Sequence, residues 1–534
     1  YDSRRAEALL NIYMDTTATD DVIALRALTG FFLIMFRYRR RPLPRSLADT
    51  LAAARETATW PGDLRTAAIE FMRTRDTARI TEQLSKDIIP TLSKLAPEMT
   101  ERLGDGELDI ESMAEGENPA WDDMLKQDGL GDKLREISEL QAEGGDVYMS
   151  SFGALKHFPF FREMANWFLP FTTSHSEVAS ADNAGGSLSA TLQRLPFLCD
   201  NDKFSVMMAM AIAPSSQREA ATRAMESQQG AMHDMLSEIE KADSKTRRKN
   251  IINNYLRDLY RFYNLFRRKG EFFNPFARGI DLMAIDALSE GYNDIETLTV
   301  IAEFNIKHKF REEAAALFKK IDLLTEPDAS RAQKIGFCLE KLGRHAEAIS
   351  FYEEAEMLGG DSAWLLEHMA RTYRRLGQPR KAIETYRKLE AVAPDNFSAT
   401  VAMGNAFLEA RRPAEAEARF HKALYLSPES DNARRGLAWS QFLQRKFDAA
   451  ADNYNKLLAS SPTPEDYLNA GHTARGTGNM REAINYYVLS MESASKDIDG
   501  LEADLAADSP WLAEAGINTG DDKLIIEAIL YMKK

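Results

Sequence analysis

Apolar residues recur at helical spacing along most of the chain, and the period-two alternation typical of strands is rare. Amphipathic segments of the first 294 residues include DVIALRALTGFFLIMFRYRR and RKNIINNYLRDLYRFYNLFRRKG. Two polar stretches interrupt this part, an acidic, glycine-punctuated one at 103–119 and a second at 172–187. The pattern predicts an all-α fold. It divides this part into a helical region at 1–102, an acidic linker with an aromatic-rich helical segment at 103–185, and a helical region at 186–294.

Beyond residue 294, three classes of residue recur with a period of 34, shortened to 33 in the last repeat. Alanine recurs at Ala314, Ala348, Ala382, Ala416, Ala450 and Ala483. A ring follows four residues later at Phe318, Tyr352, Tyr386, Phe420, Tyr454 and Tyr487. A small residue lies twelve residues before each alanine, at Ala302, Gly336, Ala370, Gly404, Ala438 and Gly471. These rows predict helix pairs in which the small residues allow close approach and the ring fills the remaining space.

Helix-ending prolines follow the same period, at Pro394, Pro428 and Pro462. Rows and prolines together resemble the tetratricopeptide repeat family, over about residues 295–496. The resemblance implies an α-α superhelix of six helix pairs, in which each pair buries its apolar face against the next. The remaining segment, 497–534, ends in DDKLIIEAILYMKK, an amphipathic helix expected to cap the stack.

The resemblance also implies a groove, lined by the first helix of each pair, that holds a peptide of a partner protein. Beside the small row, helical spacing points these side chains inward: Arg371, Arg374, Asn405, Arg435, Trp439, Phe442, His472 and Arg475. A cationic and aromatic lining suits an acidic peptide or a terminal carboxylate. In an alternative interpretation, the arginines simply pair with nearby glutamates on a solvated face. Asn405 matches the asparagine of the family's chaperone-binding clamp, but Val401 replaces its lysine, so that clamp is broken.

Charge and hydropathy exclude some classes of binding partner. The chain carries 82 acidic and 67 basic residues, a net charge of −15, which disfavours general affinity for nucleic acid or anionic membranes. The longest apolar run, FFLIMF, is far shorter than the roughly 20 residues that cross a bilayer. The RYRRRPLPR that follows is either a basic patch or a helix end whose cations meet the helix dipole. Two isolated cysteines indicate a reducing compartment, so we expect a cytoplasmic protein with no membrane or nucleic-acid partner.

Catalytic motifs are absent from the sequence: it contains no Walker loop, G-x-S-x-G, H-E-x-x-H or paired C-x-x-C. We therefore expect no catalytic residues, metal, cofactor or small-molecule substrate. The ring-rich segment KHFPFFREMANWFLPF, residues 156–171, is either a docking helix or part of a core. Three hypotheses follow. They are a non-catalytic scaffold or adaptor that binds a partner peptide, a structural subunit whose N-terminal helices form the interface, and an N-terminal enzyme or nucleic-acid module with a partner-binding tail.

Overall fold

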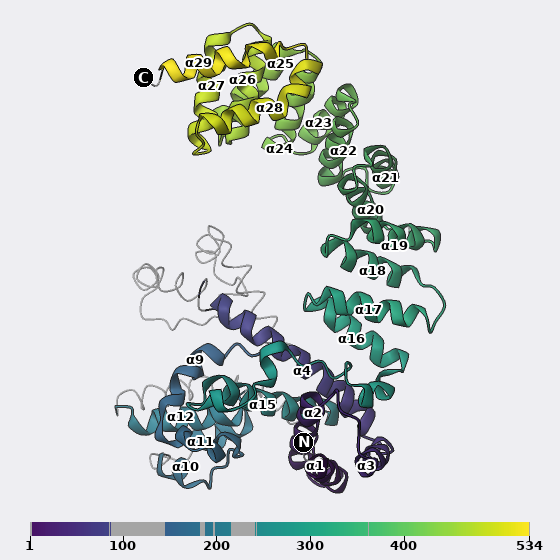
Figure 1. Cartoon of the computed structure of the whole chain (residues 1–534), viewed down its shortest axis with the longest axis vertical. Helices are drawn as coiled ribbons and strands as arrows, with labels where there is room; N and C mark the ends of the chain where they lie inside the picture. The colour runs from purple at the N-terminus through teal and green to yellow at the C-terminus, as the bar shows by residue number, and fades with distance from the viewer. Residues whose placement is uncertain are drawn as a thin grey trace. The chain divides into compact units, whose positions relative to one another are not determined.

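The computed structural model describes residues 3–84, 86, 145–181, 187–195, 198–214, 241, 243–360 and 362–532. Every regular element among these residues is a helix, as the periodicity predicts, and none is a strand (Figure 1). The predicted acidic stretch at 103–119 lies outside the described residues. The chain divides into two compact units, Tyr1–Phe304 (unit 1) and Asn305–Lys534 (unit 2), which are described separately.

Unit 1 combines long helices with short, irregular ones. Its principal helices are α1 (Ser3–Thr16), α2 (Asp21–Arg37), α3 (Arg45–Arg55), α4 (Trp60–Gln83), α12 (Asp200–Ile212) and α15 (Ser244–Leu265). Shorter α-helices are α9 (Met149–Gly153), α10 (Ser176–Ala181) and α11 (Ser187–Arg194). The start of α2 is fixed by Asp20, whose carboxylate accepts from the backbone N–H groups of Val22 and Ile23. Helix α15 packs against both α2 and α4, which makes it the central element of this unit.

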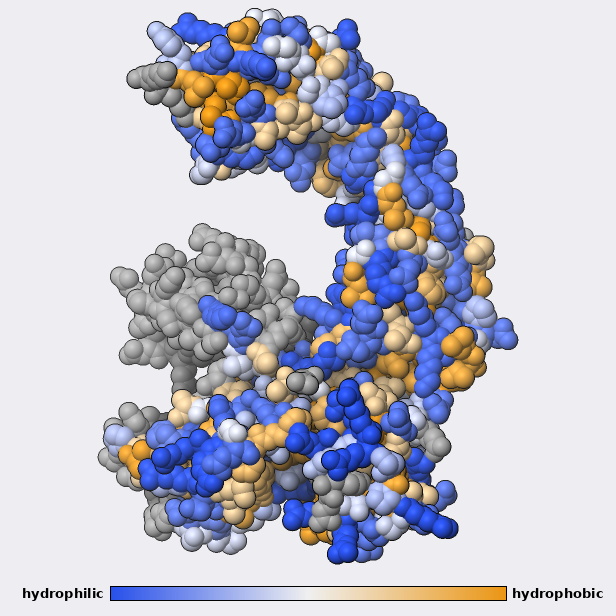
Figure 2. Space-filling view, viewed as in Figure 1, coloured by the Kyte–Doolittle hydropathy of each residue, from blue (hydrophilic) through white to orange (hydrophobic). Residues whose placement is uncertain are grey.

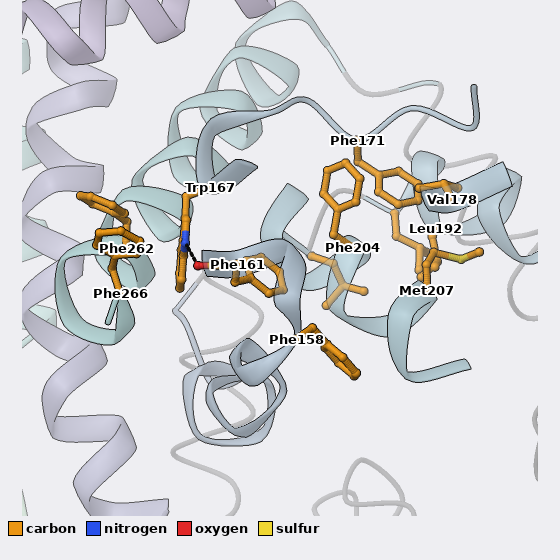
Figure 3. Close-up of a cluster of buried hydrophobic side chains, with 12 residues drawn as sticks. Phe158, Phe161, Trp167, Phe171, Val178, Leu192, Phe204, Met207, Phe262 and Phe266 are labelled. Atoms are coloured by element: carbon orange, nitrogen blue, oxygen red, sulfur yellow. Dashed lines mark hydrogen bonds between the residues drawn. The ribbon is translucent and has the colours of Figure 1, made fainter. Parts of the chain in front are cut away.

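The ring-rich segment at 156–171 belongs to a core. It forms three short 3-10 helices, η2 (Ala154–His157), η3 (Pro159–Arg162) and η4 (Met164–Phe168), instead of one docking helix. The buried ring of Trp167 lies between Phe161 and two further rings, Phe262 of α15 and Phe266 just after it. Its indole N–H donates to the Phe161 carbonyl at 2.8 Å (Figure 3). Because the indole N–H is satisfied, the ring is buried without a polar penalty.

Next to this core lies a network of buried charges, which we call the buried ion network. Arg261 on α15 is fully buried; it donates from Nη1 to Asp146 at 2.7 Å and from Nε to Asp202 at 2.8 Å. The Lys156 ammonium donates to Asp202 at 2.9 Å and to the Ser205 hydroxyl at 2.8 Å. Burial alone would raise the pKa of Asp146, but the positive charges of Arg261 and of the neighbouring Arg257 outweigh it and lower that pKa.

Unit 2 is a succession of helical hairpins, which α16 (Ile295–Lys307) leads into. The first helices of the hairpins are α18 (Ala329–Lys341), α20 (Ala363–Arg375), α22 (Phe397–Glu409), α24 (Asp431–Leu443) and α26 (Pro464–Gly476). The second helices are α19 (His345–Met357), α21 (Pro379–Val392), α23 (Pro413–Leu426), α25 (Phe447–Leu458) and α27 (Met480–Ser493), preceded by α17 (Arg311–Asp322). From α17 to α27, consecutive helices pack against one another (Figure 1).

The three predicted rows meet inside the hairpins. The recurring alanines from Ala314 to Ala483 are fully buried. A Cβ added to Gly404 would lie 2.8 Å from the ring of Phe420, and one added to Gly436 of the next hairpin would lie 2.3 Å from the same ring. The ring therefore occupies the space between its own first helix and the first helix that follows. Glycine is required at both positions because backbone and ring touch there.

The turn between the two helices of a hairpin repeatedly contains a residue with positive φ. Glycine takes this position in several hairpins, for example Gly343 (φ 76°) and Gly377 (φ 66°). The hairpins α22–α23 and α24–α25 have arginine instead, Arg411 (φ 58°) and Arg445 (φ 62°). A side chain in this left-handed region costs about 1 kcal/mol relative to glycine. The two arginines therefore carry a local backbone cost that glycine would avoid.

The C-terminal segment consists of α28 (Ile498–Glu514), the 3-10 turn η8 (Thr519–Asp521) and α29 (Asp522–Met532). Leu501, Leu505, Ile525 and Ile529 form a buried cluster with the last hairpin. Helix α29 also exposes apolar side chains, and apolar surface is visible at this end of unit 2 (Figure 2): Leu524, Leu530, Tyr531 and Met532. In the described part of the chain, no helix combines the length and the hydropathy needed to span a membrane.

Candidate peptide-binding face

We call the side of α18, α20, α22, α24 and α26 that carries the predicted groove residues the inner face. On α20, Arg371 donates to Glu367 at 2.6 Å, and its side chain is 41% exposed. Arg374 forms a forked contact with Glu409 of α22, with Nη2 at 2.5 Å from Oε1. Pairing with nearby glutamates, the alternative raised by the sequence, therefore occurs at both arginines. Pairs this exposed contribute about 0–1 kcal/mol, so a partner's carboxylate can replace the glutamate at little cost.

The helix of these arginines, α20, also carries an exposed ring that the predicted groove residues did not include. Trp364 lies in the first turn of α20, two turns before Arg371 and therefore on the same side of the helix, and it is 42% exposed. Its ring centre is 4.1 Å from that of His368 and 5.8 Å from that of Phe337 on α18. The predicted groove residues lie within one turn of the small residue of their helix, which is why they did not include Trp364.

A buried carboxylate fixes the position of this ring group. Glu340 of α18 accepts from the Tyr352 hydroxyl at 2.8 Å and lies 2.7 Å from Nδ1 of His368. Burial would raise the pKa of Glu340, but these two hydrogen bonds outweigh burial and lower that pKa. The contacts join α18, α19 and α20, so His368 provides a fixed surface on which Trp364 stacks.

Asn405 of α22 follows the two arginines along the inner face. It is half-buried, and its side-chain amide has no hydrogen-bond partner among the described residues. An amide carries two donors and one acceptor, so Asn405 can bind a peptide group without breaking an existing contact. We call the inner face of α20 and α22, with Trp364, Arg371, Arg374 and Asn405, the open section.

Arg435 of α24 has a structural partner. It donates from Nε and Nη2 to the two carboxylate oxygens of Asp466 at 2.8 and 2.9 Å. Asp466 is buried and also accepts from the Thr463 backbone N–H in a capping box that starts α26. Burial would raise the pKa of Asp466, but the bonds from Arg435 and Thr463 lower it. The pair joins two consecutive hairpins.

The remaining predicted residues lie under the chain's own C-terminal segment. We call the inner face of α24 and α26, with Trp439, Phe442, His472 and Arg475, the covered section. His472 is fully buried, with Nδ1 2.9 Å from the Tyr487 hydroxyl and Nε2 3.3 Å from Asp508 of α28. Arg475 forms an ion pair with Asp522 at 2.7 Å and donates to the Asn518 carbonyl at 2.7 Å.

Helix α28 contacts the covered section through a tryptophan. The Trp511 ring is 6.3 Å from that of Trp439, which stacks on Phe442 at 4.9 Å. The Arg411 guanidinium lies 3.3 Å from the Trp511 ring centre and pairs with Glu514. Besides packing on the last hairpin, the C-terminal segment extends along the inner face through α28 as far as the α22–α23 turn. We therefore assign Phe442, His472 and Arg475 to the contact with this segment.

A cleft of about 420 Å³ remains between α28 and the covered section. Its walls include Trp439 and Leu468 from the repeats and Asp504, Asp508 and Trp511 from α28. Helix α28 contains Pro510 in its interior, which removes one backbone hydrogen bond from the helix. Part of the covered section thus remains reachable from solvent beside α28.

Among the described residues of unit 1, Ser205 and Lys156 come closest to a nucleophile–base pair, but both are buried within the ion network, out of reach of a substrate. Burial lowers the pKa of Lys156. Within the described ranges, no group of three or more histidine, cysteine, aspartate or glutamate side chains is placed to hold a metal ion.

The hairpin stack and its inner face define a helical-repeat architecture, which is typical of protein-interaction domains. Family models of the tetratricopeptide repeat match residues 328–395 and 401–463, so this section of unit 2 consists of tetratricopeptide repeats, as the sequence rows predicted. No curated protein matches the chain.

Several solved structures resemble about a third of the chain. The structure of MamA protein is 21% identical, covering 31% of this chain and 92% of its own, with a TM-score of 0.30. YrrB, described as a TPR protein with an unusual peptide-binding site, is 18% identical, covering 36% and 99%, with a TM-score of 0.32. A thermophilic TPR protein in Thermus thermophilus is 22% identical, covering 34% and 98%, with a TM-score of 0.28.

Proposed function

We propose that the protein is a non-catalytic scaffold or adaptor whose open section binds an acidic segment of a protein partner. The observation that carries this proposal is the exposed ring of Trp364 on the same side of α20 as Arg371 and Arg374. A ring and two guanidinium groups spaced along one side of a helix provide apolar contact for a peptide stem and forked donors for its carboxylates.

Two further features support the open section over the covered one. Arg371 and Arg374 pair with glutamates that are themselves 30% and 42% exposed, whereas Arg435 pairs with a buried carboxylate. Exchanging an exposed carboxylate for that of a partner has a small net cost, but removing a buried one leaves an uncompensated charge. The unpartnered amide of Asn405 adds a site for the peptide backbone.

The test compares affinity capture from a native extract by the wild-type chain and by the Arg371→Ala/Arg374→Ala variant. The control is Arg380→Ala/Arg387→Ala, which removes the same charge from exposed positions on α21. An acidic segment is then synthesised from each protein that the wild type enriches, and its Kd is measured by fluorescence anisotropy. We expect the open-section variant to weaken binding at least tenfold, because each lost charge-assisted hydrogen bond contributes about 1.5–3 kcal/mol. The control should bind as the wild type does.

A protein that co-purifies equally with all three chains contradicts binding at the open section. That result would favour the structural-subunit hypothesis, in which other surfaces form a stable interface.

A further inference from the structure

Unit 1 contains a cavity of about 600 Å³ beside the C-terminal end of α2. One side is formed by residues 36–41, and the other by Phe273, Pro275, Gly279 and Asp281. The backbone turns sharply at Gly279, with φ 68°, and a Cβ there would lie 3.2 Å from the Arg75 side chain. The far wall is thus built by a loop held close to α4.

The charge of this cavity is opposite to that of the chain. Four arginines, at positions 37, 39, 40 and 41, line it, against the one acidic lining residue, Asp281, in a protein of net charge −15. Arg37, Arg39 and Arg40 have no carboxylate partner in the part of the chain that the structure describes. Buried arginines of the same unit do pair with acids, as Arg261 does with Asp146 and Asp202.

Rings orient two of these guanidinium groups. Arg37 stacks over Phe273 with 3.7 Å from its central carbon to the ring centre, and Arg39 lies over Phe36 at 4.5 Å. Stacking uses the flat face of a guanidinium and leaves its in-plane N–H groups available to a ligand. One N–H group of Arg39 donates to the Phe36 carbonyl at 2.9 Å, and its remaining N–H groups are available.

Favourable contact with the α2 dipole explains part of this arrangement. A helix C-terminus attracts cations; Arg37 lies in the last turn of α2, and Arg39, just beyond it, donates to the last-turn carbonyl of Phe36. The helix dipole does not explain the position of Arg40, and it does not explain why four arginines line one cavity. Uncompensated cations in a cleft attract an anion, and the forked geometry of arginine matches the oxygens of phosphate.

We propose that this cavity binds a phosphate-bearing ligand, through the arginines at 37, 39 and 40. Two sources share the required chemistry, a free phosphorylated small molecule and a phosphorylated lipid headgroup. The site is independent of the partner peptide of unit 2, and it modifies the sequence-based expectation that the chain takes no small molecule.

The test uses the full chain and two probes. Inorganic pyrophosphate is titrated by isothermal calorimetry, and phosphatidylcholine vesicles with and without phosphatidylinositol 4,5-bisphosphate are examined by co-sedimentation. The variant is Arg37→Gln/Arg40→Gln, and the control is Arg267→Gln, an exposed arginine outside the cavity. The substituted positions are all on the surface, so circular dichroism should show unchanged helix content.

We expect pyrophosphate to bind the wild type and the control, with at least tenfold weaker binding to the Arg37→Gln/Arg40→Gln variant. Binding confined to the phosphoinositide vesicles, and lost in that variant, identifies a lipid headgroup as the source. Binding of neither probe, equal binding by all three chains, or equal affinity for citrate and pyrophosphate would overturn the proposal. These outcomes do not depend on whether the open section binds a peptide.

Discussion

The two units of the chain bury different kinds of side chain. Unit 1 encloses the charges of Arg261, Asp146 and Asp202 within an irregular aromatic core. Unit 2 encloses the recurring alanines, small residues and rings of its hairpins, and keeps most of its charge on the surface. In unit 2, the 34-residue repeat places small residues where neighbouring helices pack closely together. Unit 1 has no repeat, and specific ion pairs join segments that are distant in its sequence. Different kinds of substitution should therefore destabilise the two units.

The largest effect is expected at the centre of the buried ion network. Arg261→Met leaves the carboxylates of Asp146 and Asp202 buried without their shared cation, which should cost about 3–5 kcal/mol of unfolding free energy. Arg268→Met, which removes an arginine paired with Glu271 on the surface of the same unit, should leave the unfolding free energy nearly unchanged. Denaturant unfolding followed by tryptophan fluorescence measures both. Equal losses of stability in the two variants would show that the contribution of the buried ion network does not depend on its burial.

A second substitution tests close approach in unit 2. Gly404→Ala places a Cβ against the ring of Phe420, and overpacking of this kind costs about 1–3 kcal/mol. Gly62→Ala on α4 meets nothing within 4 Å, so it should be neutral or slightly stabilising. Thermal unfolding of the two variants should shift in opposite directions. A neutral Gly404→Ala would mean that the hairpin absorbs the added methyl by relaxing.

Arg411→Ala separates the covered section from the rest of unit 2. It removes the cation–π contact with Trp511 and the ion pair with Glu514, worth about 1 kcal/mol together at an exposed site. Amide hydrogen exchange in α28 should therefore become about fivefold faster, while exchange in α20 and α22 is unchanged. Arg412→Ala, which loses an exposed pair with Glu415 in the same turn, is the matched control. Equal exchange of α28 in both variants would rule out a role for the Arg411 contacts.

The smallest effect is a pH dependence of the same section. Burial lowers the pKa of His472, and the hydrogen bond with Asp508 opposes this only in part; Arg475 adds to the lowering, and Asp522 opposes it. The folded state thus binds the proton less well than the unfolded state does, so stability is lost as pH falls below about 6.5. Exchange in α26 and α28 should be faster at a pH of about 5.5 than at about 7.5, after correction for the intrinsic rates. His472→Gln should remove this difference, and a difference that persists would assign it to another group.

The sequence was sufficient for the repeat because its determinants are local. The rows of alanine, ring and small residue recur within each hairpin, so spacing alone identified the tetratricopeptide repeats at 328–463. The all-helical fold followed from periodicity in the same way. No comparable signal exists for Asp146 and Arg261, because they lie 115 residues apart and each resembles an ordinary surface charge until the fold joins them.

The inner face was predictable only in part. Spacing placed Arg371, Arg374 and Asn405 on one side of the first helices, and whether they bind a partner stays a prediction. The amphipathic pattern of 498–514 indicates a helix with a buried side, but not which surface buries it. Trp511 and Arg411 are 100 residues apart in sequence, and their contact covers residues that spacing alone would leave open.

The two arginines with positive φ give the C-terminal segment a measurable signature. Glycine would relax the backbone at Arg411 and at Arg445, where other hairpins already have it. The contacts of these arginines with the C-terminal segment offset the backbone strain only while α28 is in place. Arg411 lies over the Trp511 ring, and Arg445 donates to the Glu514 carbonyl at 3.5 Å. The effect of a glycine substitution on stability should therefore change sign: it should destabilise the intact chain but stabilise these hairpins in a chain without the C-terminal segment.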